Sequence, residues 1–354
     1  MYYYYYKTMS KKINVQIIEK QNTIDGFASN FLKFKLSGSD INYVIANTLV
    51  RIGLSLVGSF AFNPEFITIE RDTSIFNADQ MRLRISNIPI INANYKKPIV
   101  GLDKDMIIDK CIQMELDTNA SIFQMKKDGL LELEMMENKR KELLNNLHMH
   151  IEARNRTNEV MNVTSNEKFT SFFINDKKIP DIYPREVLIL KLKPGEDFIC
   201  TAVADFNIPM KNTIFSSVSV FAYEEINDNE FDIILESLRQ YEEEEIIRQC
   251  CLIAIRKLEN IQKIIVEKLE NLQSDDVEYE AEIHIENENH TLGNLLTRAL
   301  QDHPNIAFCG YKIDHPDVNE LSIKYKTEGR QFSKILKDVV GSQIKIFETI
   351  ASKF

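Results

Sequence analysis

One six-residue pattern occurs twice in this chain of 354 residues. Residues 46–51 are Ala-Asn-Thr-Leu-Val-Arg and residues 293–298 are Gly-Asn-Leu-Leu-Thr-Arg, so both fit small-Asn-x-Leu-x-Arg. Each copy lies in a predicted helix that follows a strand and a capping turn, and each precedes further strands and a long helix. This shared context predicts two copies of one α+β unit, paired as an intramolecular pseudo-dimer.

The first copy belongs to a predicted strand–helix–strand segment. Apolar side chains alternate with lysines in the strand, and a Ser-Gly-Ser-Asp turn then offers N-cap oxygens to an amphipathic helix. The predicted elements are strand 31–36, helix 41–56, and strands 66–70 and 82–91.

The second copy belongs to a shorter segment of order β-α-β-β-α. Thr291 is the predicted N-cap of its first helix, and its last helix carries a long apolar stripe. Gly293 and Gly310 are expected to permit a close helix–strand approach and a tight bend. The predicted elements are strand 277–285, helix 291–301, strands 306–313 and 321–326, and helix 332–351.

Residues 92–205 differ in character from both copies. Short strands surround a charged helical stretch at 130–147, which predicts a β-rich lobe inserted into the first unit. The predicted strands are 147–153, 187–192 and 199–204, after which strand 218–223 resumes the first unit.

Residues 231–272 form one long predicted helical zone with a heptad-like apolar seam. Such a seam suits a separate partner helix as well as packing on the helix's own domain, and periodicity alone does not choose between them. The acidic run 242–245 fits the first turn of a helix that begins near Tyr241, and is otherwise a solvated surface. The seam residues are Ile247, Cys251, Ala254, Leu258, Ile261, Ile265 and Leu272.

Together these patterns predict an α+β fold, in which two dimerisation units of order strand, helix, strands and long helix form a pseudo-dimer with an inserted β-rich lobe. The predicted parts are a mostly disordered N-terminal tip (1–29), a discontinuous first dimerisation domain (30–90 and 205–272), the lobe (91–204) and a second dimerisation domain (277–354).

Composition excludes several classes of protein. The net charge of −10 argues against a protein whose main task is to grip phosphate backbones, although a local basic face is compatible with it. The chain lacks any apolar run of about 18 residues, so no membrane span is predicted. Five cysteines without C-x-x-C spacing fit a reducing compartment and argue against a zinc site.

Catalytic motifs are not found. The chain lacks a P-loop, the common hydrolase and metalloprotease signatures, and the clustered aspartates that two-metal phosphoryl transfer needs. Four histidines of the last unit lie in a strand, at a helix start and in two turns, which argues against a metal site: His284, His290, His303 and His315. We therefore expect no catalytic residues, metal or other cofactor.

Three consecutive segments near the C-terminus resemble the small α-like subunit of DNA-directed RNA polymerase, which is the eleventh subunit of eukaryotic RNA polymerase II and subunit L of archaea. They are 290–296 (His-Thr-Leu-Gly-Asn-Leu-Leu), 304–312 (Pro-Asn-Ile-Ala-Phe-Cys-Gly-Tyr-Lys) and 315–316 (His-Pro). Residues 46–52 and 84–90 resemble the partner α-like subunit, the third of polymerase II or archaeal D, and residues 163–165 and 190–196 resemble its inserted lobe more loosely. A fusion of both partners resembles the polymerases of large cytoplasmic DNA viruses.

The sequence departs from this family in three places. Val50 stands where the family usually has the first of two adjacent arginines, so Arg51 remains alone. Residues 207–215 lack the His-Ala-Lys triplet of a loop that tends to touch the second-largest subunit. The lobe holds only Cys111 and Cys200, so no zinc or iron–sulfur site is carried over.

The resemblance implies a non-catalytic assembly scaffold that docks the second-largest and largest polymerase subunits beside small subunits, without sequence-specific nucleic-acid binding of its own. It implies an intracellular location, in the virion and host cytoplasm rather than the nucleus. Asn47 and Arg51 are favoured for docking over a role as ordinary surface residues, because a guanidinium suits bidentate contact with a carboxylate. The predicted interface residues are Asn47, Leu49, Arg51, Ile52, Leu292, Asn294, Leu295, Leu296, Phe332, Leu336 and Phe347.

Two other functions are compatible with parts of the chain. A stand-alone coiled-coil interaction protein would use the helical zone 231–272. An enzyme of unrecognised type in the inserted lobe is the third hypothesis, and no motif supports it.

Overall fold

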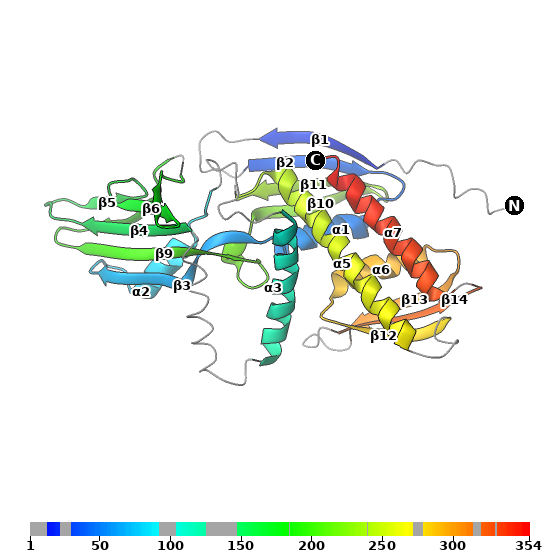
Figure 1. Cartoon of the computed structure of the whole chain (residues 1–354). Helices are drawn as coiled ribbons and strands as arrows, with labels where there is room; N and C mark the ends of the chain where they lie inside the picture. The colour runs from blue at the N-terminus through cyan, green and yellow to red at the C-terminus, as the bar shows by residue number, and fades with distance from the viewer. Residues whose placement is uncertain are drawn as a thin grey trace.

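The computed structural model describes residues 13–21, 30–91, 104–124, 147–183, 185–238, 240–271, 279–313, 320–329 and 331–354. The described strands form four sheets, and helices pack on them in the mixed α+β fold that the sequence predicts. Figure 1 shows three regions in a row: a β-rich region at the left, a central sheet with helices, and a second sheet with its helices at the right.

The central sheet has four antiparallel strands in the order β1-β2-β11-β10. Every second side chain of β2 and β11 is buried, because one face of this sheet is covered and the other is more exposed. The elements are β1 (Asn14–Gln21), β2 (Asn30–Ser37), α1 (Tyr43–Ser55), β10 (Val218–Asn227), β11 (Glu230–Ser237) and α5 (Glu243–Asn271).

One prediction for this region is corrected. The zone 231–272 is not one helix, because Phe231, Ile233 and Leu235 alternate at the period of a strand and bury their side chains from β11. Strand β1, which pairs along β2, lies within the tip 1–29 that is predicted to be mostly disordered. Residues 1–12 and 22–29 of this tip lie outside the described residues.

The strand predicted at 82–91 is also wrong, because helix α2 (Ala78–Ser86) occupies its first part. Asn77 and Gln80 form a capping box, in which each side chain accepts a hydrogen bond from the other residue's backbone N–H, at 2.8 and 3.1 Å. Met81 and Ile85 are fully buried one turn apart. In a strand Leu83 and Ile85 would lie on the same face. Leu83 is instead 61% exposed, so the alternation of residues 82–85 does not mark a buried strand face.

Strands β3 and β9 run from the central region into the β-rich region (Figure 1). They pair antiparallel and belong to a five-stranded sheet of order β3-β9-β4-β6-β7, beside a β5-β8 pair. This sheet therefore includes residues before 90 that the sequence assigns to the first dimerisation domain. The elements are β3 (Ser59–Asp72), β4 (Leu147–Arg154), β5 (Met161–Thr164), β6 (Thr170–Ile174), β7 (Lys177–Ile179), β8 (Leu188–Leu192), β9 (Asp197–Asn207) and the 3-10 helix η2 (Thr213–Phe215).

Helix α3 (Lys104–Gln124) packs on α5 and was missed in the sequence. Its buried side chains recur at helical spacing, at Ile107, Ile108, Cys111 and Ile112. The charged helical stretch predicted at 130–147 lies outside the described residues, apart from Leu147 at the start of β4.

Gln240 connects the segment before α5 to the start of β3 by hydrogen bonds. Its buried side-chain amide accepts a hydrogen bond from Phe60 N and donates to Phe60 O at 2.8 Å and Ile90 O at 3.1 Å. These bonds satisfy main-chain groups that would otherwise be buried unpaired, at a cost of about 1–3 kcal/mol each.

The C-terminal unit has a three-stranded sheet of order β12-β14-β13. The N-cap of α6 is Asn289 and not Thr291, because Asn289 Oδ1 accepts from Thr291 N at 2.9 Å. A Cβ on Gly293 would lie 2.7 Å from Leu321 Cδ1, so the close helix–strand approach expected there is confirmed. The elements are β12 (Glu280–Glu286), α6 (His290–Gln301), β13 (Ile306–Ile313), β14 (Glu320–Thr327) and α7 (Phe332–Ala351).

Candidate functional site

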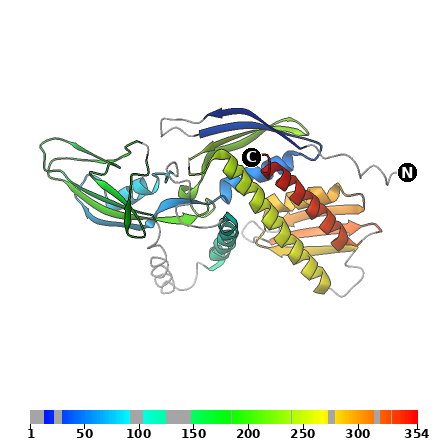
Figure 2. The same ribbon diagram turned by 45° about the horizontal axis from the view of Figure 1, so that its top comes forward.

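The long helices α5 and α7 lie side by side and antiparallel in both views (Figures 1 and 2). Phe354, just beyond α7, packs edge-on against Phe34 of β2 with ring centroids 4.9 Å apart. Lys268 near the end of α5 donates to His284 O of β12. Each long helix thus ends on the sheet of the other unit.

The predicted seam of α5 is buried within this chain. Its six described members are fully buried, and α7 contributes a similar apolar stripe. The seam therefore has its packing partners in the same chain, and the coiled-coil hypothesis loses the exposed surface that it needs. The described seam residues are Ile247, Cys251, Ala254, Leu258, Ile261 and Ile265.

The predicted interface residues separate into two groups. The apolar ones are at most 2% exposed and fill the interior between the sheets and helices of the two units: Leu49, Ile52, Leu292, Leu295, Leu296, Phe332, Leu336 and Phe347. Asn47 and Asn294 are half-buried, and Arg51 is exposed. The polar group alone is therefore open to contact with another protein.

The two motif helices both begin with an asparagine N-cap. Asn42 caps α1 and Asn289 caps α6, and each cap lies five residues before the asparagine of the repeated motif. Sequence reasoning missed both caps, although Asn is a strong N-cap signal. Helices α1 and α6 also contact each other.

A buried charge cluster joins three distant segments, and sequence reasoning missed it. Lys257 Nζ of α5 lies 2.7 Å from Glu115 Oε2 of α3 and 3.1 Å from Glu288 Oε2 in the turn before α6. The exposed fractions of these side chains are 4%, 1% and 12%. Burial raises the pKa of Glu288 to about 6, with Lys257 opposing the rise and Glu115 adding to it.

We expect Glu288→Gln to change how stability depends on pH. Because the folded-state pKa lies above the ordinary value of 4.5, the contribution of Glu288 to stability is complete below that value and is lost as pH rises through about 6. The loss amounts to roughly 2 kcal/mol. Urea unfolding measures the free energy of unfolding of the variant and of the parent. The difference, variant minus parent, should rise by that amount between pH 4.5 and pH 8.

Glu286→Gln is the matched control, since Glu286 is exposed on β12 close to Glu288. The difference between this control and the parent protein should change little with pH. An equal pH response of the two variants would contradict the role assigned to burial.

A cavity of about 930 Å³ lies between the two units. Its walls come from the start of α1, the β10–β11 turn, α6 and α7. Of the described residues, Arg298 and His303 are its basic side chains, and Arg298 lies 3.6 Å from Asp302. Among the residues that the structure describes, five carboxylates line it: Asp40, Glu225, Asp228, Asp302 and Asp338.

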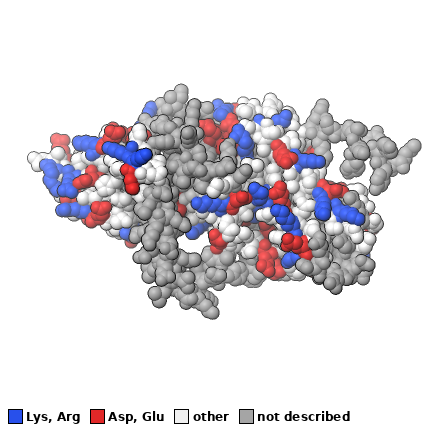
Figure 3. All heavy atoms as spheres, viewed as in Figure 1, with Lys and Arg blue, Asp and Glu red and all other residues white. Residues whose placement is uncertain are grey.

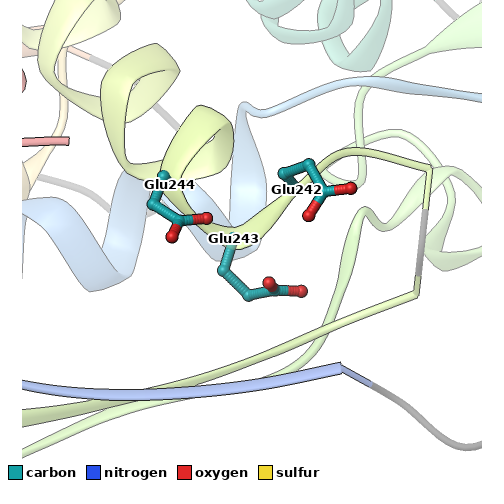
Figure 4. Close-up of side chains that lie close together, drawn as sticks. All are labelled: Glu242, Glu243 and Glu244. Carbon is teal, nitrogen blue, oxygen red and sulfur yellow. The ribbon is translucent and has the colours of Figure 1, made fainter. Parts of the chain in front are cut away.

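Glu242, Glu243 and Glu244 bring carboxylate oxygens within 4.8 Å of one another (Figure 4). Helix α5 begins at Glu243, so the first of the two alternatives for the acidic run 242–245, the first turn of a helix, is the one found. Glu243 accepts a hydrogen bond from Ser237 Oγ, and Glu244 pairs with Lys20 of β1. The helix N-terminus favours these negative charges, which accounts for the cluster without a metal ion.

Charges of both signs are mixed over the described part of the face in Figure 3. None of the described helices combines the length and apolarity needed to cross a membrane. All five cysteines are free and buried, and burial raises the pKa of the Cys111 thiol to about 11. They act as small apolar side chains.

Comparison with known proteins places these features in a family. Residues 280–353 match the RNA polymerase Rpb3/Rpb11 dimerisation domain. A protein of Acanthamoeba polyphaga mimivirus, named as a DNA-directed RNA polymerase subunit, is 23% identical over 332 residues, covering 90% of this chain and 89% of that protein.

Two further relatives match shorter parts. The RNA polymerase subunit Rpo11 of Sulfolobus acidocaldarius is 33% identical over 73 residues, which are 21% of this chain and 78% of that subunit. An RNA polymerase RPB3-11 homolog of African swine fever virus is 32% identical over 113 residues, which are 29% of this chain and 31% of that protein.

The matched domain and the paired long helices define a DNA-directed RNA polymerase subunit with a dimerisation domain. The chain belongs to the family of α-like polymerase subunits, with the two subunit types fused in one polypeptide.

Proposed function

We propose that this protein is an assembly scaffold, on which the second-largest and then the largest polymerase subunit dock. Arg51 carries the proposal: it is exposed on α1, while Leu49 and Ile52 of the same helix are buried in the shared interior. Among the described residues Arg51 has no ion-pair partner. The buried face of α1 holds this helix in place, and an exposed guanidinium on such a helix suits bidentate contact with a carboxylate of another subunit.

The scaffold consists of two α-like units that pair as an intramolecular pseudo-dimer. The reciprocal contacts of the long helices support this proposal, since Phe354 reaches β2 and Lys268 reaches β12. The shared start of α1 and α6 supports it as well. The β-rich region around the β3-β9-β4-β6-β7 sheet extends to one side of the pair (Figure 1).

The scaffold takes no part in nucleotide addition and does not read DNA sequence. The viral relatives support a place in the virion and host cytoplasm. Within the polymerase, small subunits would join the same assembly.

We expect Arg51→Ala to weaken association with the second-largest subunit and to leave the fold intact. The loss should be about 2–5 kcal/mol if the contact is buried in the complex, and far less at its rim. Calorimetric titration of the second-largest subunit into the purified chain measures the association, and circular dichroism checks the fold.

Lys263→Ala removes an exposed cation from α5 and serves as the control. It should leave the affinity unchanged. Equal affinity of the Arg51→Ala variant and the parent chain would count against docking at α1, and slower elongation by fully assembled polymerase would place this chain near the chemistry instead.

A further inference from the structure

The motif helices α1 and α6 can be aligned residue by residue. The caps Asn42 and Asn289 and the motif residues Asn47 and Asn294 share one offset along the chain. On this offset Glu288, before α6, occupies the position of Ile41 before α1.

The long helices align by their buried positions. Glu243 and Phe332 are the first buried residues of α5 and α7, and six further buried positions then follow in step: Ile246, Ile247, Cys250, Cys251, Leu258 and Ile261 in α5, with Ile335, Leu336, Val339, Val340, Phe347 and Ile350 in α7. On this alignment Lys257 occupies the position of Ile346.

These equivalences relate the buried charge cluster to the cavity between the units. Ile41 and Ile346 line the cavity, while their equivalents Glu288 and Lys257 meet Glu115 of α3. Helix α3 therefore lies on the surface around Glu288 and Lys257, which corresponds to the open cavity around Ile41 and Ile346.

The flanks of the two long helices differ accordingly. Gln249 and Ile253 of α5 are buried at 5% and 0% exposure. Their equivalents on α7 are Asp338, which is exposed, and Ser342, which is half-buried, and both line the cavity. Helix α3 pairs with α5 of one unit through Arg256–Asp109 and Lys257–Glu115, whereas the other unit has an open acidic groove beside α7.

We propose that this groove binds a helix of another polymerase subunit, in a position equivalent to that of α3. The inference rests on the proposed pseudo-dimer. The bound helix has an apolar side chain where α3 has Glu115, because Ile41 and Ile346 stand in place of the charged pair. It carries Lys or Arg toward the carboxylates of the rim, among them Glu225, Asp228 and Asp302.

Photocrosslinking in the assembled polymerase tests this proposal. Tyr43 lines the groove and is 46% exposed, so p-benzoylphenylalanine at position 43 should crosslink to another subunit. Mass spectrometry should locate the crosslink in an amphipathic helix flanked by Lys or Arg. The double variant Glu225→Lys with Asp228→Lys should lower the crosslink yield at least tenfold, and Glu225→Gln with Asp228→Asn should lower it less.

A second crosslinker position separates failure of this proposal from failure of the pseudo-dimer. With p-benzoylphenylalanine at Phe354, whose ring packs on Phe34, the crosslink should fall in β2 of the same chain. If that crosslink forms while position 43 yields none, or reaches only this chain or nucleic acid, the groove proposal is overturned. If the crosslink from position 354 is missing, the pseudo-dimer itself is wrong.

Discussion

Lys257→Met is expected to destabilise the folded chain by about 3–5 kcal/mol, because it leaves two buried carboxylates without their cation. Glu115 is 1% exposed and Glu288 12%, so water cannot replace the ammonium group. The loss is a large part of the 5–15 kcal/mol that typically stabilises a domain. Urea unfolding, followed by circular dichroism, measures it.

The triple variant Lys257→Met, Glu115→Gln and Glu288→Gln separates charge from packing. It removes the unpaired charges and should recover most of the lost stability. If the single and triple variants were equally unstable, the cost would lie in the packing of the lysine stem and not in its charge.

Leu296→Asp is expected to unfold the C-terminal unit or to separate it from the N-terminal α-like unit. Either result should block polymerase assembly. Leu296 is fully buried on α6, so the change removes a packed leucine and buries a carboxylate at a cost of several kcal/mol. Gel filtration of the reconstituted polymerase should show the assembled peak lost.

Leu83→Asp makes the same chemical change at a helical position that is 61% exposed. This control should assemble like the parent chain. Assembly of the Leu296→Asp variant at the parent's yield would mean that the C-terminal unit is not needed for the complex.

The C-terminal unit could be predicted closely from sequence. Helix α7 has the predicted bounds, and the predicted start of α6 differs by one residue from the observed start. Both helices carry an uninterrupted apolar stripe between clear turns, so one period dominates each segment.

The errors arose where two periods compete. Residues 82–85 alternate like a strand, yet the capping box at Asn77 and Gln80 starts a helix there. Residues 231–235 continue an apolar pattern into α5, although they form a buried strand. Short apolar runs leave this choice to tertiary packing.

The candidate site was only partly accessible to sequence reasoning. The repeated motif led to Asn47 and Arg51, but the charge cluster joins Lys257 to a glutamate 142 residues away. A lysine beside an apolar seam has the pattern of a solvated residue, and no local signal indicates that α3 covers it. Such long-range pairs follow from topology alone.

The antiparallel pairing of α5 and α7 within one polypeptide has a consequence for assembly. Seven residues separate the end of α5 from the first described residue of the C-terminal unit. A short tether of this kind gives the two units an effective concentration in the millimolar range, if its length matches the span. Their one-to-one ratio is then fixed at translation, and dilution that would dissociate two separate chains leaves this pair together.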